Sequence, residues 1–259
     1  MSAELKAARS RSTLILTLSN PGFLNTLHPD MYAAAIETLA TAERDDSIRV
    51  VILTGADHFF CGGGNLQRLL DYRSRSNSDK VETIDNLHRW IDVLRDCPKP
   101  VIAAVDGAAV GAGFSLALAC DLIVAGTGAR FSMPQVRVGL TPDGGGSWLL
   151  MQGLPRLLAS ELMIEGKPIS ASRLHQLGIV NRLVADGTAL DKALIWADEL
   201  AQLSVHTIEQ TKSLLGDAAR NSLAENFDSG KRAFLETLSH PDSQEGIDAF
   251  LNRRLPEYD

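Results

Sequence analysis

Cysteine, aromatic side chains and long apolar runs are scarce in this sequence, and each scarcity excludes a class of protein. The 259 residues include 3 cysteines and 5% aromatic residues. Cys61, Cys97 and Cys120 are odd in number and share no metal-ligand spacing, so we expect small core residues rather than disulfides or a zinc site. No run approaches the roughly 18 apolar residues of a membrane span, and the first residues contain no apolar signal segment. These features predict a cytoplasmic protein without a metal site and without a membrane partner.

An excess of positive charge is missing as well. The chain has 25 lysines and arginines against 32 aspartates and glutamates, which gives a net charge of -7. A nucleic-acid partner is therefore not expected, because such proteins usually carry a basic surface. The 45% hydrophobic and 22% charged residues are ordinary for a globular chain that is long enough to bury a substantial core.

The first part of the chain alternates short apolar runs with helical patterns. Apolar runs at 13–18, 50–53 and 101–105 predict strands, and a helical pattern covers Pro29–Glu43. A strand, a helix and a strand in this order predict a parallel crossover and an α/β fold. Further strands are expected at 121–125 and 130–132, a helix at 81–95, and a short helix with a mobile surface loop within 66–78.

The sequence changes character near Pro155. Beyond it, apolar residues recur at helical spacing with little sign of strands. The predicted helices cover 157–165, 171–177, 190–203, 205–219, 223–238 and 244–251, and one short strand is expected at 179–184. We therefore divide the chain into an α/β part at residues 1–155 and a mainly helical part at residues 156–259.

Three turns of small residues follow predicted strands. One contains glycines 62–64, the second places Ala112 between two glycines, and the third places Asp143 ahead of three glycines. None matches a P-loop or a dinucleotide-binding fingerprint. Bare backbone at the start of a helix can offer unpaired N–H groups to a negative charge, although close packing of strand and helix also explains small residues.

Several side chains near these turns have two interpretations. Asp143 can cap the helix that follows it or act as a general acid or base. His58 is a possible base but more simply a solvated loop residue, and Cys61 has no recognisable histidine partner for a nucleophilic role. Trp148 can line a pocket or pack in the core. Three arginines can meet phosphate groups or form a solvated helix face, at positions 68, 73 and 75.

Several segments, in this order, resemble one enzyme family. Residues 60–66 (Phe-Cys-Gly-Gly-Gly-Asn-Leu) are similar to its segment Phe-x-Ala-Gly-Ala-Asp-Ile. Residues 101–121 are similar to its segment Ile-Ala-Ala-Val-x-Gly-x-Ala-x-Gly-Gly-Gly and the helix after it, which ends in Cys-Asp. Residues 25–27 resemble its early Asn-Ala-Leu, and residues 131–146 and 166–184 follow its pattern. The chain thus resembles the crotonase family, also called the enoyl-CoA hydratase/isomerase superfamily, over nearly its whole length.

The resemblance implies a superhelix of ββα turns with a helical C-terminal region that forms a homotrimer or a dimer of trimers. It also implies a coenzyme A (CoA) thioester as the substrate, with no covalently bound cofactor. The N–H groups of Gly64 and Ala112 would form an oxyanion hole around the thioester carbonyl, where an enolate develops. The positions at which the family grips CoA are occupied here by Leu24, Thr26, Gly62, Asn65 and Leu66.

The chain departs from the family's hydratases at two positions. Those enzymes carry glutamates where this sequence has Ser115 and Gln135, which we assign to the substrate site although neither is a competent base. The segment around Asp143 (Pro-Asp-Gly-Gly-Gly-Ser-Trp) resembles ring-1,2-epoxyphenylacetyl-CoA isomerases, which use this aspartate as acid and base, and also resembles alternative oxepin-CoA hydrolases.

These departures favour an isomerase-type reaction on an enoyl-CoA. Such a reaction shifts a double bond or isomerises a ring, with Asp143 carrying the proton, in fatty acid or phenylacetate degradation. Enoyl-CoA hydration is the alternative within the same family. Non-catalytic binding of an acyl-CoA is the alternative outside enzymes.

Overall fold

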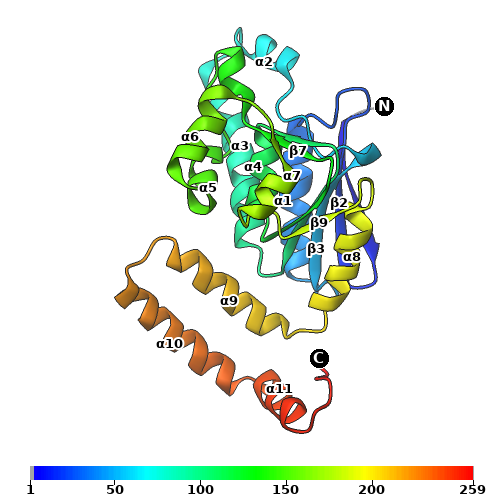
Figure 1. The fold of residues 1–259 in the computed structure, drawn as a ribbon, viewed down its shortest axis with the longest axis vertical. Coiled ribbons are helices and arrows are strands. Elements are labelled where there is room, and N and C mark those ends of the chain that lie inside the picture. The colour runs from blue at the N-terminus through cyan, green and yellow to red at the C-terminus, as the bar shows by residue number, and fades with distance from the viewer. Residues whose placement is uncertain (1–2, 259) are drawn as a thin grey trace.

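A six-stranded, mostly parallel sheet forms the centre of the molecule (Figure 1). The computed structural model describes residues 3–258. The strand order is β1-β2-β3-β4-β6-β9; only the β1–β2 pair is antiparallel. The strands are β1 (Glu4–Ser10), β2 (Thr13–Ser19), β3 (Val50–Gly55), β4 (Val101–Val105), β6 (Leu122–Gly126) and β9 (Arg182–Val184). The predicted α/β fold with parallel crossovers is confirmed.

A second, smaller sheet is formed by segments that follow strands of the main sheet. Its three strands are β5 (Ala108–Val110), β7 (Arg130–Ser132) and β8 (Ile169–Ser170), in the order β5-β7-β8. β5 follows β4 after two residues, and β7 follows β6 after three. Each of these segments therefore passes from the main sheet to the small sheet, which brings the turns that follow β5 and β7 to one side of the molecule.

Helices cover both faces of the main sheet because the strand residues alternate between two apolar clusters. In β4, Val101 and Ala103 face the larger cluster and Ile102 faces the smaller one. The larger cluster is completed by α1 (Pro29–Glu43), α3 (Asn77–Asp96) and α4 (Ala112–Ala119), and the smaller one by α8 (Ala189–Leu200). Small residues of α8, such as Ala193, let this helix approach the sheet closely.

The remaining short helices surround the turns. They are α2 (Leu66–Tyr72), α5 (Gly146–Gly153), α6 (Arg156–Glu165) and α7 (Ala171–Gln176), with the 3-10 helices η1 (Ala56–His58) and η2 (Pro134–Val138). No helix within residues 3–258 combines the length and the apolar character that crossing a membrane requires.

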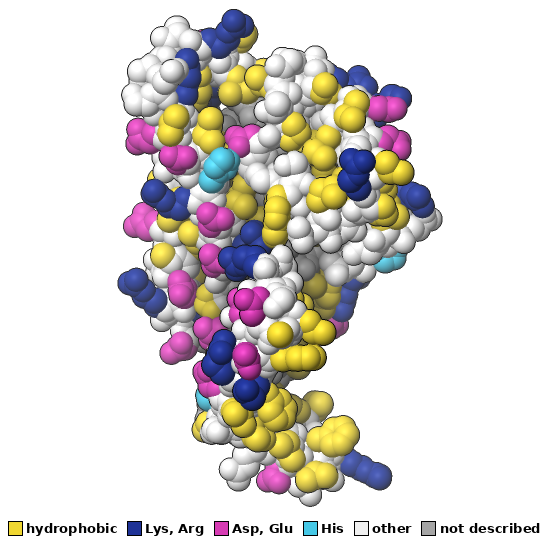
Figure 2. Space-filling model, turned by 90° about the vertical axis from the view of Figure 1, so that its left-hand side faces the viewer, with side chains coloured by type: hydrophobic (Ala, Val, Ile, Leu, Met, Phe, Trp, Pro, Cys, Tyr) yellow, Lys and Arg dark blue, Asp and Glu magenta, His cyan; other side chains and the backbone are white. Residues whose placement is uncertain are grey.

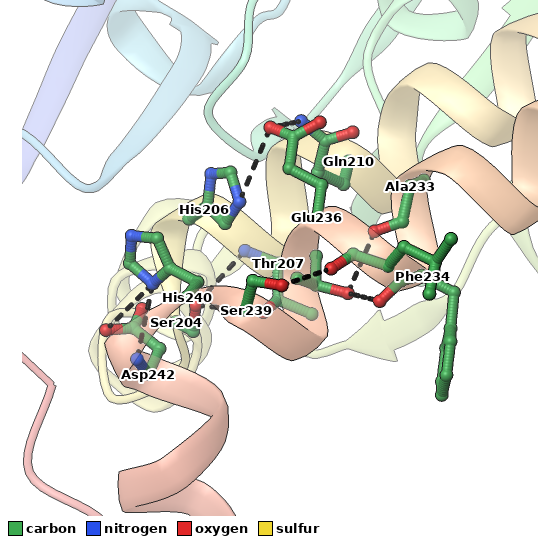
Figure 3. A network of polar contacts seen from close by, with 12 residues as sticks. Ser204, His206, Thr207, Gln210, Ala233, Phe234, Glu236, Ser239, His240 and Asp242 are labelled. Carbon is green, nitrogen blue, oxygen red and sulfur yellow. Dashed lines mark hydrogen bonds and ion pairs between the residues drawn. The ribbon is translucent and has the colours of Figure 1, made fainter.

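Three helices extend away from the sheet, and we call them the C-terminal arm: α9 (Val205–Ala218), α10 (Leu223–Ser239) and α11 (Pro241–Leu251). The rings of His206 and His240 stack with centroids 4.3 Å apart and join the start of α9 to the start of α11 (Figure 3). Large apolar side chains of the arm stay exposed, including Phe227 (67%), Phe234 (66%) and Phe250 (83%). Figure 2 shows hydrophobic side chains gathered at this end of the molecule.

Most predicted elements are confirmed, and two expectations were wrong in extent. The helix at Pro29–Glu43 has the bounds expected from the sequence. The loop expected up to residue 78 ends earlier, because the Ser76 hydroxyl accepts a hydrogen bond from the Asp79 N–H and starts α3 at Asn77. The strand expected at 179–184 is shorter than predicted and covers only Arg182–Val184.

Strand β1 was not predicted, because it is an edge strand with mostly exposed residues and therefore lacks an apolar run. The division near Pro155 stays a prediction.

One ion pair ties the arm to the sheet. Lys212 of α9 donates to the Asp121 carboxylate (2.5 Å) and to the Lys99 carbonyl (2.9 Å). The same carboxylate oxygen accepts from the Val101 N–H (2.7 Å) at the start of β4. Burial raises the pKa of Asp121, and Lys212 opposes this shift by stabilising the charged form.

We expect Lys212→Met to lower the free energy of unfolding by roughly 2 kcal/mol at neutral pH. This loss is smaller than for a fully buried pair, because 28% of the Asp121 side chain is exposed.

The size of this loss should depend on pH. Because burial already raises the pKa of Asp121, a carboxylate that has lost Lys212 can become neutral by taking up a proton. The loss should therefore shrink as the pH falls through the pKa of Asp121. Denaturant unfolding at two pH values measures both effects. Lys6→Met is the matched control, since the exposed Lys6–Glu4 pair of β1 should contribute almost nothing. An equal loss at both pH values would contradict this account.

Candidate active site

Direct backbone hydrogen bonds join the first two glycine turns, although about 50 residues of sequence separate them. The Cys61 N–H donates to the Ala108 carbonyl and the Val110 N–H donates to the Cys61 carbonyl, both at 2.9 Å. These bonds align residue 61 with β5 as a parallel bridge. The turn that follows Cys61 and the turn that follows β5 are consequently held side by side.

The contact between the two turns requires glycine. A Cβ atom at Gly63 would lie 2.4 Å from the Val110 carbonyl oxygen, and one at Gly113 would lie 2.7 Å from the Cys61 carbonyl oxygen. Gly63 also has φ = +81°, which disfavours other residues. The close-packing interpretation of these glycines is therefore correct, and it is compatible with a role for the free N–H groups beside them.

The Gly64 and Ala112 N–H groups have no hydrogen-bond acceptor within residues 3–258. Ala112 is the first residue of α4, where a helix has no internal acceptor for the N–H. Gly64 pairs with Leu27 in an isolated parallel bridge, in which Leu27 donates to the Gly63 carbonyl and the Gly64 N–H takes no part. Gly64 and Ala112 both line a cavity of about 820 Å³. The cavity wall thus carries two backbone donors on adjacent turns.

Most of the cavity wall is apolar, and its charged side chains are mainly cationic. Among the described residues that line it, Asp143 is the one carboxylate, whereas four side chains are cationic, namely Arg68, Arg73, Lys80 and Arg137. Apolar lining residues include Leu27, Leu69, Ile84, Leu87, Val110 and Leu140. The site therefore suits a ligand with an apolar portion and negatively charged groups.

Asp143 does not cap α5, so that interpretation of the sequence is wrong. The helix starts at Gly146 with Gly145 as its cap residue and without a capping side chain. Instead, Oδ1 of Asp143 accepts a hydrogen bond from the Gly144 N–H (2.6 Å) and lies 2.7 Å from Nε2 of His88. His88 belongs to α3 and lies 55 residues earlier, so sequence spacing gave no sign of this pair.

Ser115 and Gln135 have different surroundings. Ser115 is fully buried in α4, and its hydroxyl donates to the main-chain carbonyl of Asp143 (3.1 Å) rather than lining the cavity. Gln135 does line the cavity, close to Gly111. Its Oε1 is buried and has no hydrogen-bond partner within the described part of the chain.

The five residues expected to hold CoA fall into two groups. Gly62, Asn65 and Leu66 line the cavity. Leu24 and Thr26 do not line it and pack against Gly62 from outside, where Leu24 accepts a hydrogen bond from the Gly62 N–H (2.8 Å). The Asn65 side chain caps α2 by accepting from the Arg68 N–H (3.1 Å), which fixes the helix beside the cavity.

Two tyrosines of the cavity were missed by sequence reasoning. Tyr32 lies on the buried stripe of α1, and burial raises its pKa, so the phenol stays protonated. Burial also acts to raise the pKa of Tyr72, but the hydrogen bond from Arg68 (2.9 Å) and the nearby guanidinium groups lower it overall. The apolar spacing of α1 was a signal that could have found Tyr32.

The other candidate residues lie away from the cavity chemistry. Cys61 is fully buried, burial raises its thiol pKa to about 12, and the thiol donates to the Asn25 carbonyl, so it is no nucleophile. His58 is exposed and does not line the cavity. Trp148 lies under the Arg95 guanidinium in a different hollow of the surface.

Comparison with known proteins identifies the family. The enoyl-CoA hydratase/isomerase family model matches residues 8–259. The chain is 34% identical over 249 residues to the 1,2-epoxyphenylacetyl-CoA isomerase of Escherichia coli (strain K12), covering 96% of this chain and 95% of that protein. It is 32% identical over 257 residues to the 2,3-dehydroadipyl-CoA hydratase of the same strain, covering 99% and 98%. A crystal structure of an enoyl-CoA hydratase from Polaromonas sp. JS666 superposes with a TM-score of 0.97 at 49% identity, covering 99% of this chain and 100% of that one.

The chain belongs to the enoyl-CoA hydratase/isomerase family and has the crotonase fold. It is an acyl-CoA enzyme, and the family's CoA thioester substrates fit a cavity with cationic and apolar walls. Within residues 3–258, no group of three or more His, Cys, Asp or Glu side chains is arranged to hold a metal ion. Both hydratases and isomerases are among the relatives, so family membership alone leaves the reaction open.

The contact between the turns gives a test with opposite signs at two glycines. Gly113→Ala places a methyl group against Cys61, so we expect a loss of about 1–3 kcal/mol in unfolding free energy and lower turnover of acyl-CoA. Gly216→Ala in α9 meets only the flexible end of Arg220, at 3.6 Å, and should gain up to about 1 kcal/mol from helix propensity. Denaturant unfolding and activity assays of both variants are the measurements. Equal effects on stability would show that the turns are not tightly packed.

Proposed function

We propose that this chain is an enoyl-CoA isomerase-type enzyme in which Asp143 carries the proton. The observation that supports it is the single carboxylate in the lining of the cavity, within the described residues. Isomerisation needs one group that removes a proton from one carbon and returns it to another. A lone aspartate beside two backbone donors can meet that requirement.

The backbone donors stabilise the charge that develops during the reaction. Removing a proton next to the thioester carbonyl turns the carbonyl oxygen into an enolate oxygen. The N–H groups of Gly64 and Ala112 line the cavity and are available for that oxygen. Such donors are fixed before the reaction begins, and removal of one typically costs about 3 kcal/mol in transition-state stabilisation.

The remaining lining residues suit the two ends of an acyl-CoA. We assign the CoA portion to Gly62, Asn65 and Leu66, with Leu24 and Thr26 supporting this edge from outside. Cationic side chains of α2 and η2 are available for phosphate groups. We assign Gln135, which lines the cavity beside Gly111, to the acyl portion of the site, while Ser115 holds the segment that carries Asp143.

Enoyl-CoA hydration is the second candidate. It is favoured by the 49% identity to a structure described as an enoyl-CoA hydratase and by the 32% identity to a dehydroadipyl-CoA hydratase. Hydration requires one group to activate water and an acid to protonate carbon. The uncharged Gln135 is a poor substitute for a second carboxylate, which is why isomerisation is the stronger candidate.

The decisive variant is Asp143→Asn. We expect turnover of 2-enoyl-, 3-enoyl- and epoxyphenylacetyl-CoA to fall by roughly 10²- to 10⁴-fold, because an amide cannot move the proton. Product analysis by mass spectrometry and chromatography separates isomerisation from hydration. Asp92→Asn is the matched control, since Asp92 is an exposed residue of α3 outside the cavity and should leave turnover unchanged.

Three outcomes contradict the proposal in different ways. An Asp143→Asn variant with normal turnover removes the aspartate from the mechanism. A hydrated product that disappears in this variant favours the second candidate. Tight binding without turnover of any of the three thioesters favours a non-catalytic acyl-CoA-binding protein.

We also propose that the C-terminal arm joins copies of this chain into a homotrimer or a dimer of trimers. Its exposed apolar side chains support this assignment, since large exposed patches are typical of protein interfaces. Phe227 and Phe234 are seven residues apart on α10, so both lie on one side of the helix.

Charge on this side of α10 should prevent assembly. We expect the double variant Phe227→Asp, Phe234→Asp to sediment with the mass of one chain, whereas the unmodified protein sediments as a multiple of three. Ile195→Asp on α8 is a control with a similarly exposed apolar residue outside the arm. A single-chain mass for the unmodified protein would remove the arm from any role in assembly.

A further inference from the structure

Asp143 has one hydrogen-bonded oxygen and one free oxygen. Oδ1 accepts the Gly144 N–H (2.6 Å) and lies 2.7 Å from Nε2 of His88, while Oδ2 has no hydrogen-bond partner within the described residues. His88 does not line the cavity, whereas Asp143 does. The carboxylate thus stands between the cavity on one side and the imidazole on the other.

We propose that His88 is the positioning residue of Asp143. By donating its Nε2–H to Oδ1, His88 fixes the carboxylate plane and leaves Oδ2 as the oxygen that takes the substrate proton. This inference rests on the proposed function, because it concerns how the aspartate of that reaction is held. His88 contacts the substrate at no step and acts through Asp143.

The surroundings single out His88 for this role. Among described side chains, it alone is within hydrogen-bond distance of the Asp143 carboxylate. The Gly144 N–H belongs to the same turn as Asp143. It therefore moves together with the carboxylate and cannot hold it in place relative to the cavity. α3 is a 20-residue helix whose Trp90 and Leu94 are fully buried, so it is a firm support for the imidazole.

Other charged and titratable groups near Asp143 remain in place when His88 is changed. Those that share the cavity are Tyr32 of α1, Arg68 and Tyr72 of α2, Arg73 after it, Lys80 of α3 and Arg137 of η2. None of them donates a hydrogen bond to Asp143 within the described residues. A change in kcat on substitution of His88 can therefore be assigned to the lost donor.

The test compares His88→Leu with His88→Gln, which differ in whether a side-chain N–H can reach Oδ1. We expect His88→Leu to lower kcat by roughly 10- to 100-fold with little change in KM, because the misplaced carboxylate still leaves the binding walls intact. His88→Gln should restore most of kcat, because its side-chain N–H can reach Oδ1.

The double variant His88→Leu, Asp143→Asn shows whether His88 acts through Asp143. We expect its residual turnover to equal that of Asp143→Asn alone, because two residues that act as one unit are not additive. Denaturant unfolding of each variant verifies that the fold is kept, and the exposed pair should change stability little.

Several results would overturn the inference. An unchanged kcat in His88→Leu, or no difference between the leucine and glutamine variants, would leave His88 without a role. A further loss in the double variant would mean that His88 acts on the substrate directly. If Asp143→Asn is inactive while His88→Leu behaves as the unmodified enzyme, this inference fails and the proposed function stands; a fully active Asp143→Asn removes the proposed function itself.

Discussion

The close backbone contact between the two glycine turns is the constraint on which the rest of the site depends. Cys61 hydrogen-bonds to both ends of β5, and the glycines at 63 and 113 permit an approach that any side chain would block. The Ala112 N–H lies at the start of α4, where helix geometry provides no internal acceptor. The Gly64 N–H takes no part in the bridge with Leu27, so both donors belong to the backbone and need no side chain to provide them.

The same helix that provides one donor also fixes the position of the carboxylate. One turn after Ala112, the Ser115 hydroxyl holds the main-chain carbonyl of Asp143. A Cβ atom at Gly146 would lie 3.0 Å from that hydroxyl, so the glycines after Asp143 allow the segment to lie against α4. The Ala112 N–H and the segment that carries Asp143 are therefore both positioned by α4. This suits a reaction that tolerates little error in the distance between these groups and the substrate.

Local sequence predicted what depends on local physics. Apolar runs located β2, β3, β4 and β6 of the main sheet, and the proline and apolar spacing located α1 with its observed bounds. The glycine turns and the single aspartate were also visible. His88 was not, because its pairing depends on how α3 packs beside a turn 55 residues later. The capping role considered for Asp143 was wrong for a related reason. Whether its carboxylate hydrogen-bonds to the start of α5 or to the imidazole of His88 depends on tertiary packing, which local sequence does not show.

A hydratase and an isomerase are about equally similar to this chain, at 32% and 34% identity, so overall similarity does not decide between the two reactions. The reaction depends on a few side chains instead. Among the described residues of the cavity wall, Asp143 is the one carboxylate, and neither Ser115, which holds the main chain, nor Gln135 carries a charge. The proposed reaction, which moves one proton between two carbons, needs no second carboxylate, whereas adding water would require a further group to activate it.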